Sequence, residues 1–307
     1  MKHAPKKLYI LPFDHRGSFI KMFGLAQDNL TNADVKKLSD YKHIVYEGFL
    51  EAFKMGVPKA YAALLVDEQF GSAIQLEAKK KGITRLLPVE ISGQDEFDFE
   101  YGKNFEKHIK KFSPEYVKVL VRYNPGGDKE MNERQLKRLK VMSDFCHKNN
   151  YQYLFELLVP TTPEQLAESG GSEEIYDTTM RPNLMKRAME ELQRGGVEPD
   201  VWKIEGLEDP QDMFEVAKQG RSQGRGHVGI VVLGRGESDE KVKKWLSAAA
   251  GVPGVIGFAV GRTVWKEALL EHLAGKISRK EAAEIIAKNF KGYADLFETS
   301  MPRSHKS

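Results

Sequence analysis

The sequence is poor in several features that mark particular classes of protein. Its 307 residues include one cysteine, Cys146, which excludes an intramolecular disulfide and favours a reducing, cytoplasmic setting. No closely spaced group of Cys and His residues supports a structural zinc site. The 47 basic and 44 acidic residues leave a formal net charge of only +3, which is too small to indicate a nucleic-acid partner.

Long apolar runs are also absent. The basic segment 1–7 leads directly into residues 8–12, and no stretch is long enough for a signal peptide or a membrane span. We therefore expect neither export nor a membrane partner. No GxGxxG motif follows the first apolar run and no GxxxxGK[ST] motif occurs, so the sequence gives no support to a dinucleotide or P-loop nucleotide site.

The sequence does contain enough apolar material for a sizeable core, with 41% hydrophobic and 30% charged residues. Short apolar runs recur, and each ends in polar or glycine residues. The eight runs are 8–13, 61–66, 83–89, 116–121, 153–159, 200–204, 228–233 and 255–260. Stretches of helical character lie between them, including 33–55, 72–81, 132–148, 182–194, 239–250 and 279–297.

Continuously apolar strands joined by helical crossovers predict a parallel sheet that is covered on its outer face. Eight such units favour a single (β/α)8 TIM barrel over residues 1–307, with the barrel at about 8–298 and short terminal extensions. An open, doubly wound α/β sheet is the alternative, because periodicity does not detect closure. We expect residues 160–177 to form a long polar loop.

One lysine occupies a position that a barrel should fill with an apolar side chain. Lys203 shares a strand face with Val201 and Glu205, whereas Trp202 and Ile204 form a bulky apolar face that suits the helix layer. We therefore expect Lys203 to point into the barrel. A buried lysine either pairs with a carboxylate or loses its charge, and a second cation nearby lowers the pKa of such an amine, which frees it to attack a ketone.

Two more charged residues are expected on the inner face of neighbouring strands. Lys118 in the fourth run would supply the second cation, and Glu156 in the fifth run would supply a carboxylate for proton transfer. The pattern favours imine chemistry, and a neutralised Lys-Glu-Lys network without chemistry is the alternative. Asp14 ends the first run and would orient a substrate hydroxyl or pair with a lysine. We expect the adjacent His15 to be a surface residue.

Two glycine-arginine segments end the last two runs. Loops after strands seven and eight of a TIM barrel commonly bind phosphate, because glycine lets backbone amides approach and arginine binds the oxygens. We expect Gly234, Arg235, Gly261 and Arg262 to form such a site.

Acidic residues also follow the second and third runs, namely Asp67, Glu68 and Glu90. Carboxylates at these strand ends would suit a divalent metal. The histidines are scattered, however, and no HxxxH or DxD spacing gathers ligands, so we expect hydroxyl binding or ion pairing here and no metal site.

Seven segments together resemble a known family. They are LPFDHRGS at 11–18, LVDEQFG at 65–71, KVLVRYNP at 118–125, FELLVP at 155–160, DVWKIEG at 200–206, LGRG at 233–236 and GFAVGRT at 257–263. Over about residues 8–297 the chain is similar to the aldolase-type domain that follows the sugar kinase in some bacterial inositol-catabolism proteins. It also resembles, more distantly, the class I tagatose 1,6-bisphosphate aldolases.

The resemblance implies a TIM barrel whose Schiff-base lysine lies on the sixth strand and matches Lys203. By the same matching, Glu156 is the proton shuttle, Lys118 and Asp14 are active-site neighbours, and the two glycine-arginine segments hold phosphate. The implied reaction cleaves 6-phospho-5-dehydro-2-deoxy-D-gluconate into dihydroxyacetone phosphate and malonate semialdehyde, and it requires neither a metal nor an organic cofactor.

The kinase part is absent from the sequence, which leaves two substrates open. The inositol-derived substrate ends in a carboxylate, whereas tagatose bisphosphate carries a second phosphate. Arg122, Arg16 and Arg181 are the available cations for that end, and one bidentate arginine would suit a carboxylate.

Two further alternatives remain at this point. One is metal-dependent retro-aldol cleavage, and the other is a non-catalytic barrel that binds a phosphosugar and regulates or scaffolds a partner. In each case we expect the ligand to be a small phosphorylated keto sugar. The oligomeric state is left open, with a homo-oligomer included.

Overall fold

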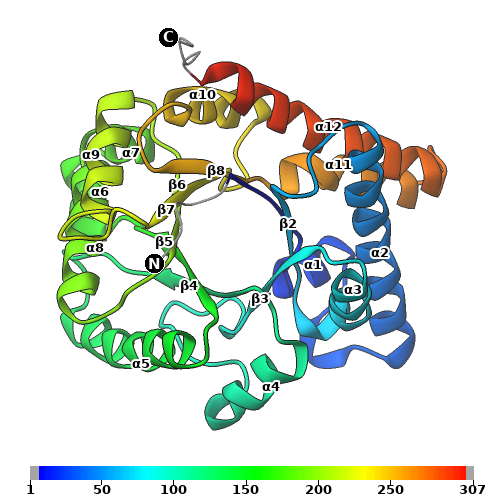
Figure 1. The fold of residues 1–307 in the computed structure, drawn as a ribbon, viewed down its shortest axis with the longest axis horizontal. Coiled ribbons are helices and arrows are strands. Elements are labelled where there is room, and N and C mark those ends of the chain that lie inside the picture. The colour runs from blue at the N-terminus through cyan, green and yellow to red at the C-terminus, as the bar shows by residue number, and fades with distance from the viewer. Residues whose placement is uncertain (1–6, 302–307) are drawn as a thin grey trace.

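The computed structural model describes residues 7–301, and most of the expected terminal extensions lie in the segments 1–6 and 302–307, outside the described residues. Eight parallel strands form a closed barrel in sequence order, and β8 pairs back with β1. The strands form the central ring in Figure 1 and the helices surround it. The predicted (β/α)8 barrel is therefore confirmed, and the open-sheet alternative is wrong.

The strands are short and almost entirely buried. They are β1 (Leu8–Pro12), β2 (Ala62–Leu65), β3 (Thr84–Pro88), β4 (Tyr116–Arg122), β5 (Gln152–Leu158), β6 (Val201–Glu205), β7 (Gly229–Leu233) and β8 (Val255–Ala259). Each lies within or close to one of the eight apolar runs in the sequence.

The helices follow the strands in alternation. They are α1 (Gly17–Met22), α2 (Asn32–Lys54), α3 (Glu68–Lys80), α4 (Phe105–Phe112), α5 (Lys129–Lys148), α6 (Pro163–Glu168), α7 (Glu173–Thr179), α8 (Arg181–Arg194), α9 (Pro210–Gly220), α10 (Asp239–Ala249), α11 (Arg262–Leu273) and α12 (Arg279–Ser300). Two short 3-10 turns occur at Gln27–Asn29 and Gly102–Asn104.

The prediction that residues 160–177 form a loop is wrong, because α6 and the start of α7 occupy this segment. Thr162 begins α6 with a capping box, in which its side chain accepts from the Gln165 amide and Gln165 accepts in return from the Thr162 amide. Ser172 caps α7 with a single bond, in which its side chain accepts from the amide of Ile175. These caps stabilise helices that are too short to give a clear apolar period.

The alternation of side chains along β6 places its residues as predicted. Val201 packs in the cluster inside the barrel, whereas Trp202 and Ile204 belong to the cluster between the barrel and the helices. Lys203 therefore points inward. In the register of the sheet it lies beside Glu156 of β5.

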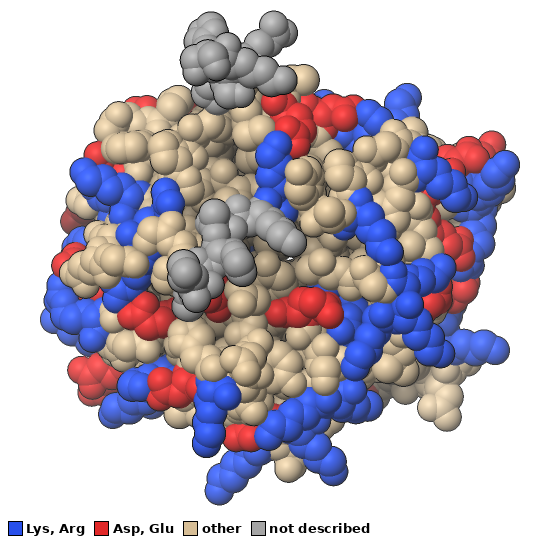
Figure 2. Space-filling model, in the orientation of Figure 1, with Lys and Arg blue, Asp and Glu red and all other residues tan. Residues whose placement is uncertain are grey.

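The last helix completes the outer layer. α12 packs against α2, and Phe290 of α12 contacts Phe49 of α2 and Phe258 of β8. Acidic and basic side chains are interspersed over the face of the molecule in Figure 2, which fits the small net charge. None of the helices within residues 7–301 has the length and apolarity required to span a bilayer.

Candidate active site

A cavity of about 550 Å³ lies at the carboxyl ends of the strands. It is lined by side chains from β1, β4, β5 and β6 and by the loops that follow β1, β3, β7 and β8. Ten of the residues that the sequence singled out for catalysis or substrate binding line this cavity: Asp14, Arg16, Lys118, Arg122, Glu156, Lys203, Gly234, Arg235, Gly261 and Arg262. The barrel therefore gathers residues that are up to 248 positions apart in the sequence, from Asp14 to Arg262.

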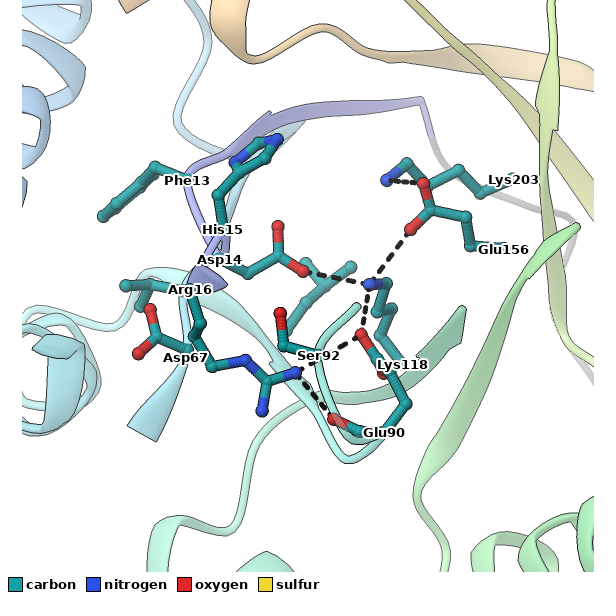
Figure 3. Close-up of polar contacts among 12 residues, drawn as sticks. Phe13, Asp14, His15, Arg16, Asp67, Glu90, Ser92, Lys118, Glu156 and Lys203 are labelled. Carbon is teal, nitrogen blue, oxygen red and sulfur yellow. Dashed lines mark hydrogen bonds and ion pairs between the residues drawn. The ribbon is translucent and has the colours of Figure 1, made fainter. Parts of the chain in front are cut away.

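Lys203 and Glu156 form the centre of the site. The Nζ of Lys203 lies 2.7 Å from Oε1 of Glu156, and the Lys203 side chain is only 5% exposed. The other carboxylate oxygen of Glu156 lies 3.0 Å from the Nζ of Lys118, so this glutamate bridges two lysines (Figure 3). Glu205 does not pair with Lys203, because it contacts Arg235 and accepts from the backbone amide of Val159.

Lys118 is the most heavily paired cation of the cavity. Its ammonium lies 2.9 Å from Asp14, 2.7 Å from Glu90 and 3.0 Å from Glu156. Burial disfavours the charge of Lys118, but the carboxylates of Asp14, Glu156 and Glu90 outweigh it and raise the pKa of Lys118 above its ordinary value. Lys118 is therefore a fixed positive charge in the wall of the cavity.

The two lysines control the ionisation of the acids around them. Burial by itself would raise the pKa of Glu156, but the ammonium groups of Lys118 and Lys203 lower it below its ordinary value. The pKa of Asp14 is likewise lowered, because Lys118 and Lys203 overcome its burial. Burial dominates at Glu90 and raises its pKa, although Lys118 and Arg16 oppose the shift. Glu156 and Asp14 are therefore held as carboxylates.

The prediction that His15 lies at the surface is wrong. Its ring lines the cavity and packs edge-on against Trp265, with 5.6 Å between the ring centroids. Burial lowers the pKa of His15 to about 4, and Arg262, Lys42 and Lys203 act in the same direction against Asp14. A lone histidine beside a glycine gave no sign of this, because Trp265 lies 250 residues away in the sequence.

Arg16 is buried and occupied by partners within the wall. It donates to the carbonyl of Glu90 at 2.6 Å, and its guanidinium lies 3.1 Å from the carboxylate of Glu100. Arg122 is more accessible, since its side chain is 32% exposed, and it donates to the carbonyl of Gln94 at 2.6 Å. Arg122, on β4, thus lies on the side of the cavity away from β7 and β8.

Arg181 does not line the cavity. It is buried at the start of α8, where it donates to Asp177 at 2.9 Å and lies 3.8 Å from Glu205. These two carboxylates neutralise its charge, so Arg181 has a structural role and does not bind substrate at the cavity surface.

The glycine-arginine segments form the opposite end of the cavity. The turn after β7 places Arg235 at φ 52° and Gly236 at φ 83°. The guanidinium of Arg235 is turned to Asp177, at 2.8 Å, and to Glu205, at 3.2 Å. Its carbonyl accepts from the exposed Arg262 at 2.8 Å, which ties the two segments together.

Gly261 allows α11 to begin close to the barrel. A Cβ at this position would lie only 2.3 Å from the carbonyl oxygen of Pro12. The amino-terminal turn of α11, from Arg262, therefore borders the cavity, where its backbone N–H groups and its dipole favour an anion.

The acidic residues after β2 and β3 are separated by the fold. Asp67 pairs with Lys42, Glu68 pairs with His108 and Lys111, and only Glu90 reaches the cavity, where it pairs with Lys118. Lys42 was missed in the sequence, although a lysine within the apolar run 41–49 of a helix was a signal that could have identified it.

Curated relatives cover part of the chain. It is 24% identical over 201 residues to tagatose 1,6-diphosphate aldolase 2 of Streptococcus pyogenes serotype M1, across 64% of this chain and 56% of that protein. It is 26% identical over 200 residues to tagatose 1,6-diphosphate aldolase of Listeria monocytogenes serotype 4b (strain F2365), across 64% of this chain and 54% of that protein. The matched part thus spans little more than half the length of these relatives.

Solved structures share the fold over nearly the whole chain. A Schiff base-forming fructose-1,6-bisphosphate aldolase has a TM-score of 0.57 at 14% identity, covering 95% of this chain and 94% of that one. The fructose-bisphosphate aldolase of Slackia heliotrinireducens DSM 20476 has a TM-score of 0.56 at 12% identity, and the match covers 98% of this chain and 88% of that one. Identities this low show a common fold alone.

A family model matches residues 1–301, and its description is "Uncharacterized protein conserved in bacteria (DUF2090)". The match covers almost all of the 307 residues, and the chain therefore belongs to the DUF2090 family.

Proposed function

We propose that this protein is a Schiff-base (class I) aldolase that cleaves a phosphorylated keto sugar. The observation that carries the proposal is the contact of 2.7 Å between Lys203 and Glu156 inside a cavity that is bordered by the start of α11. Imine formation on a ketone phosphate needs an amine, a carboxylate that accepts its proton, and an anion site for the phosphate. The cavity has the first two at its centre and the third at one end. The names of the curated relatives agree with this class of reaction.

The first half of the mechanism forms the imine. Glu156 accepts a proton from Lys203, whose amine then adds to the substrate ketone to give a carbinolamine. Glu156 returns the proton to the departing hydroxyl, which leaves as water, and an iminium remains on Lys203. The ionised Glu156 that this step requires is maintained by the charge of Lys118, 3.0 Å away.

The second half breaks the carbon–carbon bond. Glu156 removes the proton of the hydroxyl next to that bond, the aldehyde leaves, and the bonding electron pair moves into the iminium to give an enamine. Protonation of the enamine carbon and hydrolysis release the ketone phosphate and restore Lys203. Lys118 remains charged throughout and is paired with Asp14 and Glu156. The mechanism uses no metal or organic cofactor.

The substrate that we propose is 6-phospho-5-dehydro-2-deoxy-D-gluconate, with dihydroxyacetone phosphate and malonate semialdehyde as products. Gly234, Arg235, Gly261 and Arg262 would hold the phosphate, with Arg235 contributing its backbone, since its guanidinium is paired with Asp177 and Glu205. Arg122 would bind the carboxylate at the other end, because Arg16 is buried against Glu90 and Glu100.

A ketose 1,6-bisphosphate is the second candidate substrate. The curated relatives are named for such a sugar, and Lys21 adds an exposed cation to the lining of the cavity. The two candidates differ in the group at the end of the substrate away from the shared phosphate, so the ratio of kcat/KM for the two substrates decides between them.

Borohydride reduction in the presence of dihydroxyacetone phosphate tests the mechanism. We expect one covalent adduct, which peptide mapping places on Lys203 and which is lost in Lys203→Ala. Lys203→Arg should also form no adduct, because a guanidinium does not lose its proton at neutral pH. An adduct on another lysine, or one that persists in Lys203→Ala, would reject the assignment. Sugar phosphate binding without any adduct would favour the non-catalytic barrel, and activity that is lost to EDTA and restored by a divalent ion would favour metal-dependent cleavage.

A further inference from the structure

Lys42 lies behind the cavity and is completely buried. This residue of α2 has 0% of its surface exposed and does not line the cavity. Its ammonium donates to the carbonyl of Phe13 at 2.7 Å, to the carbonyl of His15 at 3.0 Å and to the carboxylate of Asp67. The three protons of the ammonium thus have three partners.

Burying a lysine and an aspartate in the core carries a cost in folding free energy. Burial lowers the pKa of Lys42, and Asp67 only partly opposes the shift. Replacing a buried ion pair by well-packed apolar residues is often neutral or stabilising, so stability alone does not account for Lys42 and Asp67. What the pair does achieve is a link between three segments, because Asp67 also caps α3 by accepting from the amide of Phe70 at 2.8 Å.

The Phe13 carbonyl belongs to the peptide group before Asp14, and the His15 carbonyl belongs to the peptide group after His15. Holding these two peptide groups restrains the backbone of Asp14 and His15 between them, and with it the direction of the Asp14 Cα–Cβ bond. The Asp14 carboxylate is directed toward Lys118 and contacts its ammonium at 2.9 Å (Figure 3). Lys42 is therefore attached to the catalytic cavity through the backbone at residues 13–15.

We propose that Lys42 is a positioning residue for the reaction, and that it acts through the carbonyl groups of Phe13 and His15 to hold the Asp14 carboxylate against Lys118. The inference rests on the proposed function, since it assigns Lys42 a part in that reaction. Lys42 touches neither the cavity nor Lys203, so its effect on turnover is indirect.

The test uses the full-length chain with both charges of the buried pair removed. In Lys42→Met alone, Asp67 is left buried without its cation, and the protein should lose stability. The double variant Lys42→Met/Asp67→Asn leaves no unpaired charge, and the asparagine oxygen still caps α3, so the unfolding midpoint should recover most of that loss. Lys36→Met is the control, because Lys36 lies on the same helix with an exposed side chain.

In the double variant we expect kcat to fall by roughly tenfold to a hundredfold, because a shift of about 1 Å in a catalytic group has an effect of this size. The KM should change less, and a crystal structure of the variant should show Asp14 withdrawn from Lys118. Lys36→Met should retain the wild-type kcat.

Other outcomes overturn the proposal. Wild-type kcat in the stable double variant would make Lys42 a purely structural residue, whether or not Asp14 has moved. A reduced kcat with Asp14 still in contact with Lys118 would refute the route through Asp14. Absence of any adduct with the wild-type protein would instead refute the proposed function, and the crystal structure would still show whether Lys42 holds Asp14.

Discussion

Lys118 illustrates how one side chain determines the charge of its neighbours. Three carboxylates, those of Asp14, Glu90 and Glu156, converge on its ammonium. Removing one partner from a buried ionic cluster leaves charges that are neither solvated nor paired, which costs far more than the cluster itself contributes. The ionisation of Glu156 therefore depends on Lys118 as well as on Lys203, the lysine proposed to form the imine.

Lys118→Met should lower the free energy of unfolding at pH 7 by about 3–5 kcal/mol. The pKa values of Asp14 and Glu156 are lowered in the folded protein, so their stabilising effect is complete above the ordinary carboxyl pKa of about 4 and is lost as the pH falls through the folded value. The difference between variant and wild type should therefore be largest near neutral pH and should shrink as the pH falls below about 4. Urea titrations at several pH values measure it. A difference that is constant with pH would contradict the assignment.

Glu156→Gln should leave the fold intact and slow turnover by about 10² to 10⁴, because the amide accepts no proton from either Lys203 or the substrate hydroxyl. The control is Glu168→Gln, the same change at an exposed position of α6. Steady-state rates of both variants are compared with the wild type. A near-normal rate for Glu156→Gln would remove this residue from the mechanism.

Sequence reasoning performed well where a side chain is placed by its own strand. Alternation along β6 correctly predicted the inward direction of Lys203, and the order of the strands placed Glu156 beside it. It did less well where a partner comes from another element. Glu100, which contacts Arg16, lies in a loop, and Asp177, which pairs with Arg235, lies in the short helix α7; neither segment has a periodic signal.

Among the elements, the turn between β7 and α10 is a tightly constrained part of the cavity. Gly236 has φ 83°, and a Cβ there would lie 2.2 Å from Nη2 of Arg262. The turn is also tied to α7 through the pair of Arg235 and Asp177. Its geometry and the position of Arg262 are therefore set together.

Gly236→Ala should raise the KM for a phosphorylated substrate by about tenfold, because the new methyl group displaces Arg262. Gly275→Ala is the matched control, since Gly275 also has a positive φ, 70°, but no atom lies within 4 Å of an added Cβ. Both variants should lose about 1 kcal/mol of stability from backbone strain. Only the first should affect the KM, and an equal effect of both on the KM would count against the phosphate assignment.

The elements themselves were predictable to different degrees. The apolar runs located all eight strands to within a few residues, because buried parallel strands are continuously apolar. The helices α6 and α7 were not predicted, because six or seven residues are too few to establish an apolar period of 3.6 residues. Their signal was the capping residues Thr162 and Ser172.

At the scale of the whole molecule, the barrel is closed by contacts between the two ends of the chain. β8 pairs with β1, and α12 packs on α2. Closure is the property that periodicity could not predict, because an open sheet and a closed barrel have the same pattern of apolar runs. The number of strand-helix units, eight, is what predicted the closed barrel.

Phe290→Ala should test how far the helix layer is independent of the site. Phe290 is fully buried, and the cavity left by its removal should lower the free energy of unfolding by about 3–5 kcal/mol. The rate of adduct formation by the folded protein should not change, because Phe290 packs outside the barrel. Phe214→Ala provides the control, since Phe214 is 39% exposed, and its stability should be close to that of the wild type. A slower adduct rate in Phe290→Ala would show that the outer layer influences the chemistry.

The pairing of the first strand with the last one has a consequence for biosynthesis. On the ribosome, β1 emerges before β8, and its second neighbour is not available until Ala259 has been translated. The growing chain therefore carries an open strand edge while the strands between them are made, and such edges invite pairing with other chains.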